Sequence, residues 1–171
     1  SFCQEKTWEP IRPVSGRLHG CPARGGKPDG DWFASTDADV VALQETKADP
    51  AQSAEEQRSP EGWNAEWLAA QVKKGYSGVA VFSPQKAALE PPAVHRELPD
   101  PRYQGEGRLL HTEYPAFHFF NVYFPNATKD NGRLAPKMDY SDALLAHADE
   151  LRRPKPLVVS VAFHPAPRPL H

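Results

Sequence analysis

The feature that most constrains this chain is the stretch at residues 38–49, ADVVALQETKAD, where a short apolar run passes directly into polar residues. The run Val40-Val41-Ala42-Leu43 is apolar without alternation, which is the pattern of a strand buried on both faces. The polar segment QETK then lies where the strand leaves the core. Glu45 is therefore held at the rim of a sheet by a rigid element, as carboxylates that bind hard metal ions commonly are. The alternative is that QETK is only a solvated strand end that begins a turn.

Length and charge set the next limits. The chain has 171 residues, enough for one domain with a hydrophobic core, and 20 basic against 22 acidic residues, a net charge of -2. Binding to nucleic acid or to anionic lipid would therefore need a local patch. Cys3 and Cys21 lack the spacing of a disulfide scaffold or a zinc site. No stretch approaches the roughly 20 apolar residues of a membrane span, and the polar N-terminal segment is unlike a signal peptide. We expect a cytoplasmic monomer without membrane association.

Hydrophobic periodicity predicts strands and helices in one domain. A helix is expected over residues 133–152, with an apolar face formed by Leu134, Met138, Ala143, Leu144, Leu145, Ala148 and Leu151. Strands are expected at residues 39–44, 63–69, 79–82, 94–97, 108–113, 116–123 and 157–159, with short helical segments at 31–37 and 54–57. Residues 1–30 show no sustained period and are predicted to be irregular, with a weak strand near Thr7. Apolar strands combined with helices predict a layered α/β sandwich.

Three more polar segments are candidates for a site. In NVYFPN, Tyr123 and Asn126 could hydrogen-bond phosphate oxygens, although a buried tyrosine and a turn asparagine explain the pattern equally well. The segment KKGYSG at residues 73–78 suits a nucleic-acid backbone, although most charged turns are merely solvated. Arg108 begins a strand, where a structural ion pair is the simpler explanation than a ligand contact. The seven histidines have no HxxxH or HExxH spacing, so we expect them to be structural or solvated.

Taken in order, VVALQETKAD, KKGYSGVAVFS, QGEGR, NVYFPNATKDNGRL and KPLVVS resemble the exonuclease III family of apurinic/apyrimidinic endonucleases. That family lies within the endonuclease/exonuclease/phosphatase superfamily. The resemblance runs from residue 31 to residue 160 and implies a four-layered α/β sandwich, incomplete at the C-terminus. The chain would be a single partial domain with divergent segments at residues 1–30 and 161–171. The implied function is Mg²⁺-dependent (or Mn²⁺-dependent) hydrolysis of double-stranded DNA at abasic sites and 3′ ends.

The resemblance also implies roles for individual residues. Glu45 is similar to the family's metal-binding glutamate and Tyr123 to its active-site tyrosine. Asn126, Gly75 and Tyr76 resemble its contacts to the DNA backbone, and Arg108 is expected beside them.

The ends depart from the family pattern. An asparagine expected near the start is missing, and GDFN is replaced by Val161-Ala162-Phe163-His164, so that alanine stands at the aspartate position. The family's later strands, with an aspartate and an Asp-His pair, do not follow. His164 is offset from the missing aspartate and is not expected to replace it. The resemblance therefore implies a DNA repair phosphodiesterase with impaired catalysis and weak or lost metal binding, and leaves enzyme activity open. The alternatives are a non-catalytic DNA-binding or interaction module and a non-functional gene fragment.

Overall fold

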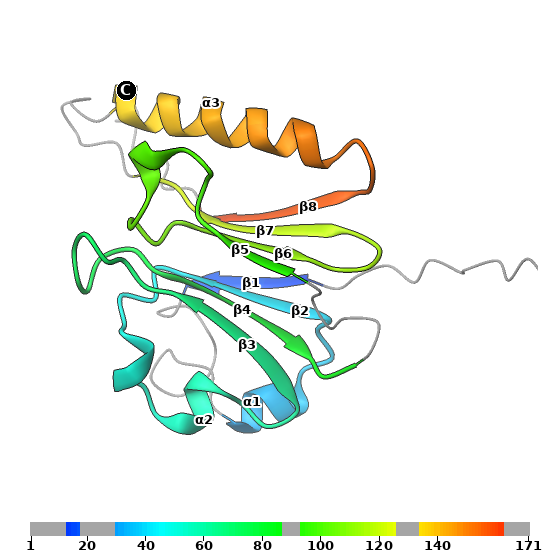
Figure 1. Ribbon diagram of the computed structural model, residues 1–171. Coiled ribbons are helices and arrows are strands. Elements are labelled where there is room, and N and C mark those ends of the chain that lie inside the picture. Colours follow the sequence, from blue (N-terminus) through cyan, green and yellow to red (C-terminus); the bar gives the residue numbers. More distant parts are fainter. Residues whose placement is uncertain (1–12, 18–29, 87–92, 126–133, 163–171) are drawn as a thin grey trace, which may run out of the picture.

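Two four-stranded sheets packed face to face form the centre of the molecule (Figure 1). The structure is a computed structural model, and it describes residues 13–17, 30–86, 93–125 and 134–162. The first sheet has the order β1-β2-β4-β3 and the second the order β5-β6-β7-β8. The strands are β1 Pro13–Arg17, β2 Val40–Gln44, β3 Trp63–Leu68, β4 Val79–Pro84, β5 Ala93–Arg96, β6 Leu109–Glu113, β7 His118–Tyr123 and β8 Leu157–Ala162.

Each sheet mixes parallel and antiparallel pairs. In the first sheet β1 runs parallel to β2, whereas β2 and β3 each pair antiparallel with β4. In the second sheet β5, β6 and β7 are antiparallel neighbours, and β8 pairs parallel with β7. The expected strands at residues 108–113 and 116–123 form a hairpin of β6 and β7, whose tight turn is closed by a hydrogen bond of 2.9 Å from the Tyr114 amide to the Phe117 carbonyl.

Helices cover the outer faces of both sheets. The short helices α1 (Gly30–Ser35) and α2 (Glu55–Arg58) lie below the first sheet in Figure 1, and the long helix α3 (Leu134–Leu151) lies above the second. Short 3₁₀ turns, η1 (Pro50–Gln52) and η2 (Pro101–Tyr103), occur in two of the connections. The order helix, sheet, sheet, helix confirms the predicted α/β sandwich. None of the helices in the described ranges is long and apolar enough to cross a membrane.

Strand β2 shows why its sequence does not alternate. Val40 and Ala42 belong to the cluster between the two sheets, whereas Val41 and Leu43 pack with Phe33 of α1 on the outer face. All five residues of β2 are buried. A strand covered on both sides must be apolar at every position.

Two expectations from the sequence are wrong. Residues 13–17 were expected to be irregular, but they form β1, an edge strand whose five residues are too few to carry a period. In α3, Met138 and Leu145 were assigned to the apolar face, but they are 51% and 62% exposed. The face that packs on the sheet instead includes Tyr140 and Leu144, with Ala143, Ala148 and Leu151 partly buried. The strand predicted near Thr7 lies outside the described residues.

Candidate functional site

Four segments that are distant in the sequence are joined by main-chain hydrogen bonds at one end of the sandwich. They are the last residue of β2 with the segment after it (44–47), the turn before β4 (75–78), the loop before β6 (105–108), and the last residue of β7 with the segment after it (123–125). The Thr46 and Lys47 amides donate to the Gly78 and Ser77 carbonyls at 3.1 and 2.9 Å. The Tyr123 amide donates to the Arg108 carbonyl at 2.8 Å. The fold therefore brings most of the predicted site residues to one place.

Glu45 follows β2 in a left-handed backbone conformation, with φ of 58°. Its side chain is 13% exposed, and the carboxylate forms an ion pair with Lys47, whose Nζ lies 2.7 Å from Oε1. The hydrogen bond that the Lys47 ammonium donates to the Glu45 carboxylate raises the pKa of Lys47 above its usual value. The neighbours Gln44 and Thr46 are buried. The QETK segment is therefore not the solvated strand end that the alternative required.

Arg108 joins the two tyrosines of the candidate site. Its guanidinium lies 5.8 Å from the ring centre of Tyr76 and 5.6 Å from that of Tyr123. It also pairs with Glu106 and donates from Nη1 to the Tyr123 carbonyl at 3.4 Å. The structural ion pair expected for Arg108 is therefore present, and the same side chain positions two aromatic rings by cation–π contact.

The turn at residues 75–78 carries further positive charge. Gly75 has φ of 73°, a conformation that suits glycine, and Ser77 is also left-handed with φ of 44°. The ammonium group of Lys73 lies 4.7 Å from the centre of the Tyr76 ring. Lys74, on an exposed side chain, adds a second cation. Asn126, expected as a further backbone contact, lies outside the described residues.

A buried amide network beneath this surface was missed by the sequence analysis. The Gln44 amide donates to Asn121 Oδ1 at 2.6 Å and to Ser160 Oγ at 3.0 Å. The Asn121 amide donates to the Leu43 and Ala80 carbonyls at 3.0 and 2.8 Å. These bonds connect β7 and β8 of one sheet to β2 and β4 of the other. The available signal was an asparagine in the middle of an aromatic, otherwise apolar strand.

The divalent metal implied by the resemblance can be tested against the donor groups present. In the described ranges no group of three or more His, Cys, Asp or Glu side chains could hold a metal ion. Glu45 remains as one hard oxygen donor, already neutralised by Lys47. Mg²⁺ commonly uses one or two carboxylates and completes its shell with water and substrate phosphate. Glu45 fits the role of such a single anchor, and not that of a closed protein cage.

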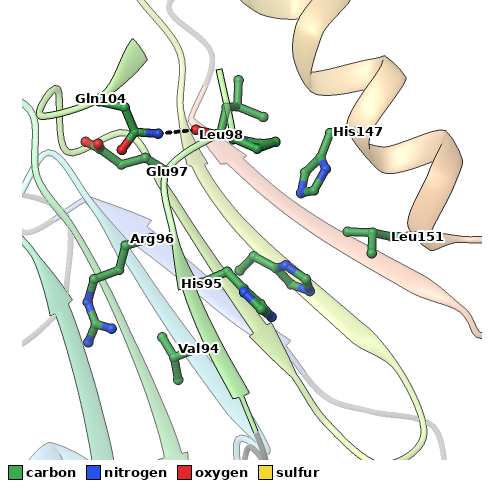
Figure 2. Close-up of a pocket in the computed structure, with 10 residues that line it drawn as sticks. Val94, His95, Arg96, Glu97, Leu98, Gln104, His147 and Leu151 are labelled. Carbon is green, nitrogen blue, oxygen red and sulfur yellow. Dashed lines mark hydrogen bonds between the residues drawn. The ribbon is translucent and has the colours of Figure 1, made fainter. Parts of the chain in front are cut away.

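A cavity of about 470 Å³ lies between β5 and α3, away from the candidate site (Figure 2). His95, His111 and His147 line it. The rings of His95 and His111 are stacked with centroids 4.8 Å apart, and His111 Nε2 lies 3.0 Å from His118 Nδ1. This histidine cluster could not be predicted from the sequence, because its members come from four different elements, β5, β6, β7 and α3.

Comparison with known proteins identifies the family. Residues 26–159 match the family described as Endonuclease/Exonuclease/phosphatase family. The chain belongs to this family. The exodeoxyribonuclease of Bacillus subtilis is 37% identical over 128 residues, which cover 75% of this chain and 48% of that protein. The DNA repair nuclease APEX1 of Danio rerio is 33% identical over 130 residues, 75% of this chain and 41% of that protein. The resemblance to the exonuclease III branch is thereby confirmed.

Solved structures show the same fold. The 3′ phosphatase NExo from Neisseria, bound to a product DNA hairpin, is 28% identical with a TM-score of 0.63 and matches 81% of this chain and 52% of its own. The chain therefore spans about half the length of the curated relatives and of the solved structure that it matches.

Proposed function

We propose that this chain is a DNA repair phosphodiesterase of the exonuclease III type, which acts on double-stranded DNA at abasic sites and 3′ ends. The observation that carries the proposal is the convergence of Glu45, Arg108, Tyr76 and Tyr123 at one end of the sandwich. The printed descriptions of the relatives, an exodeoxyribonuclease and a DNA repair nuclease, support it.

The described residues would have three different roles in such a site. Glu45 would hold Mg²⁺, which when bound supplies charge neutralisation at the scissile phosphate and an activated water. Tyr123 is buried, with an exposed fraction of 3%, as the alternative of a buried tyrosine expected. At this end of the sandwich its phenol would donate a hydrogen bond to a non-bridging phosphate oxygen. Lys73, Lys74 and Tyr76 form a cationic and aromatic surface for the DNA backbone.

One position limits the expected rate. In β8 the register pairs Ala162 with Tyr123, so the position at which the family's aspartate is expected lies beside the candidate tyrosine. Alanine there supplies no general base, and a positioned base contributes roughly 10²- to 10⁴-fold. We therefore propose that cleavage is slow and that binding to DNA is retained. A non-catalytic DNA-binding module is the second candidate, favoured by this same substitution.

An incision assay tests both candidates. A duplex with a single abasic site and a duplex with a recessed 3′ end are incubated with the protein and Mg²⁺, or with excess chelator. Metal-dependent cleavage that is lost in Glu45→Gln supports the phosphodiesterase. Binding that weakens with salt, without cleavage, supports the module. Absence of both binding and cleavage contradicts both proposals.

A further inference from the structure

We propose that Glu97 is a positioning residue of the candidate site. Its carboxylate fixes residues 105–107, and these in turn hold the turn at residues 75–78 and present Arg108. The inference rests on the proposed function, because the surface that it positions is the one assigned to DNA.

The backbone of Glu97 is in a conformation that glutamate rarely adopts. The residue directly follows β5 and has φ of 67°, in the left-handed region where glycine is favoured. Its side chain is only 9% exposed. A buried carboxylate at an unfavourable backbone position indicates that the side chain has a task that glycine could not perform.

Both carboxylate oxygens accept hydrogen bonds from the same short loop. Oε1 accepts from the Gly107 amide at 2.6 Å, and Oε2 accepts from the Gly105 amide. Both glycines have positive φ, 80° for Gly105 and 66° for Gly107. A Cβ on Gly107 would lie 2.7 Å from the Ala70 nitrogen. Hydrogen bonds to an ionised carboxylate are among the stronger ones in proteins. Glu97 thus holds the loop in a tight, glycine-dependent conformation.

The loop at residues 105–107 in turn holds the turn at residues 75–78 by hydrogen bonds. The Gly78 amide donates to the Gly107 carbonyl at 3.1 Å, and the Ser77 hydroxyl donates to the Glu106 carbonyl. The turn is therefore attached to the loop at two successive residues. Without the loop, the turn that carries Tyr76 would lose both contacts.

The turn at residues 75–78 also holds, by main-chain hydrogen bonds, the segment that carries Glu45. The Gly78 and Ser77 carbonyls accept the Thr46 and Lys47 amides. A chain of hydrogen bonds thus runs from the Glu97 carboxylate to the residues that follow Glu45. Arg108, which follows the loop directly, contacts both tyrosines of the site.

Glu97 reaches the site only through this loop. Its side chain lines the cavity under α3, together with Gln104, whose amide donates to the Leu98 carbonyl (Figure 2). The cavity beside Tyr76 is lined by other residues, namely Val72, Lys73, Tyr76, Glu106 and Arg108. Glu97 is therefore a positioning residue and not a catalytic one.

Two variants test the proposal, each with two measurements. Glu97→Gln keeps the shape and removes the charge and one acceptor, whereas Glu97→Gly removes the carboxylate and relieves the backbone. Amide hydrogen exchange of Gly105, Gly107 and Gly78 is followed by NMR, and affinity for an abasic-site duplex by fluorescence anisotropy. In both variants we expect exchange of these amides to become about 10- to 100-fold faster, the effect of losing a hydrogen bond to a charged group. Affinity for DNA is expected to fall about tenfold.

Glu97→Gly separates positioning from stability. Because glycine suits the local φ, its unfolding midpoint should fall little or not at all, while the exchange and affinity effects persist. Glu113→Gln, which removes the carboxylate partner of Lys155 on the same sheet, is the matched control and should leave both measurements unchanged.

The outcomes distinguish this proposal from the proposed function. Normal exchange at Gly105 and Gly107 in Glu97→Gly, or normal DNA affinity despite faster exchange, overturns the role of Glu97. If the unaltered protein does not bind DNA, the proposed function fails. In that case the exchange rate of the Gly78 amide in the two Glu97 variants decides whether Glu97 positions the turn. Exchange as slow as in the unaltered protein overturns the positioning role, and faster exchange supports it.

Discussion

At the scale of single residues, Asn121 shows how a polar side chain can determine the packing of two sheets. It is completely buried in β7, and its amide satisfies carbonyls on two strands of the opposite sheet. Those carbonyls, at Leu43 and Ala80, lie just inside the candidate site. Buried polar groups are costly when unpaired and specify a unique arrangement when paired.

Replacing Asn121 by alanine should therefore destabilise the fold. The substitution leaves the Gln44 amide and two main-chain carbonyls without this partner, so we expect a loss of about 2–4 kcal/mol in the free energy of unfolding. Urea denaturation followed by circular dichroism measures it. Ser160→Ala removes one acceptor of the same network and should cost only about 0.5–1.5 kcal/mol. Equal effects of the two variants would contradict the central role of Asn121.

A second prediction at this scale concerns Ala162. The β8 register places this residue opposite Tyr123, so a carboxylate introduced by Ala162→Asp should lie beside the candidate site. If a missing general base limits the rate, cleavage of abasic DNA in Mg²⁺ should rise by roughly 10²-fold or more. Ala162→Asn has nearly the same shape and cannot act as that base. A similar rate in the two variants would show that the base is not what limits cleavage.

At the scale of elements, the sequence predicted the positions of strands better than it predicted which face of a helix is buried. The apolar run of β2 and the polar residues after it sufficed to place Glu45 at a sheet rim, because burial on both faces leaves a continuous apolar signal. The apolar face of α3 was assigned correctly at Leu144 and its neighbours Ala143, Ala148 and Leu151. It was wrong at Met138 and Leu145, which are apolar but exposed. Composition alone could not show which side of the helix would meet β7 and β8. Strand β1, which pairs with β2 at the edge of the first sheet, has only five residues and is too short to leave a period in the sequence.

The contact between α3 and the second sheet should be sensitive to acid. Burial lowers the pKa of His111 to about 3, and also lowers those of His118 and His147. The charged groups near the cluster are Glu113, Lys155 and Glu150; of these Glu113 and Glu150 oppose the shift, and Lys155 reinforces it. These histidines are neutral in the fold and become protonated in the unfolded chain below its ordinary pKa of about 6.5.

Stability is therefore present above pH 6.5 and is lost as the pH falls below it. Each buried histidine adds a slope of about 1.4 kcal/mol per pH unit to the free energy of unfolding between the two pKa values. Urea denaturation at pH 7.5, 6 and 5 measures this slope. His111→Phe should flatten it, because phenylalanine packs in the same aromatic surroundings and binds no proton, whereas Met138→Gln on the exposed side of α3 should not. Parallel curves for the two variants would contradict the assignment.

At the scale of the whole molecule, the site depends on contacts that no single segment reveals. Its four segments meet because β2 ends and β4 begins in one sheet near the point where β6 begins and β7 ends in the other. The sequence indicated each segment separately, and the resemblance supplied their association. The sequence could not indicate the hydrogen bonds of Glu97 to the loop at residues 105–107, or the amide network around Asn121. These hydrogen bonds join residues that are between 8 and 116 positions apart.

The charge of the molecule makes a final prediction about DNA binding. The chain carries a net charge of -2, so its overall field does not attract DNA, and binding must depend on local cations. Lys73 and Lys74, at the turn beside Tyr76, are exposed and suited to contact phosphates. Each phosphate contact contributes about 0.9 to the slope of log K against log salt concentration.

Replacing Lys73 and Lys74 together by glutamine should lower that slope by about 1 to 2 and weaken binding to matched and abasic duplexes alike. The measurement is fluorescence anisotropy between low and moderate salt, with equal loss on both duplexes expected because phosphate contacts carry no sequence information. Lys86→Gln, also exposed but located after the far end of β4, is the control and should keep the original slope. An unchanged slope in the double variant would mean that DNA approaches another face, and that the aromatic contacts of Arg108 and Lys73 serve only to hold the turn.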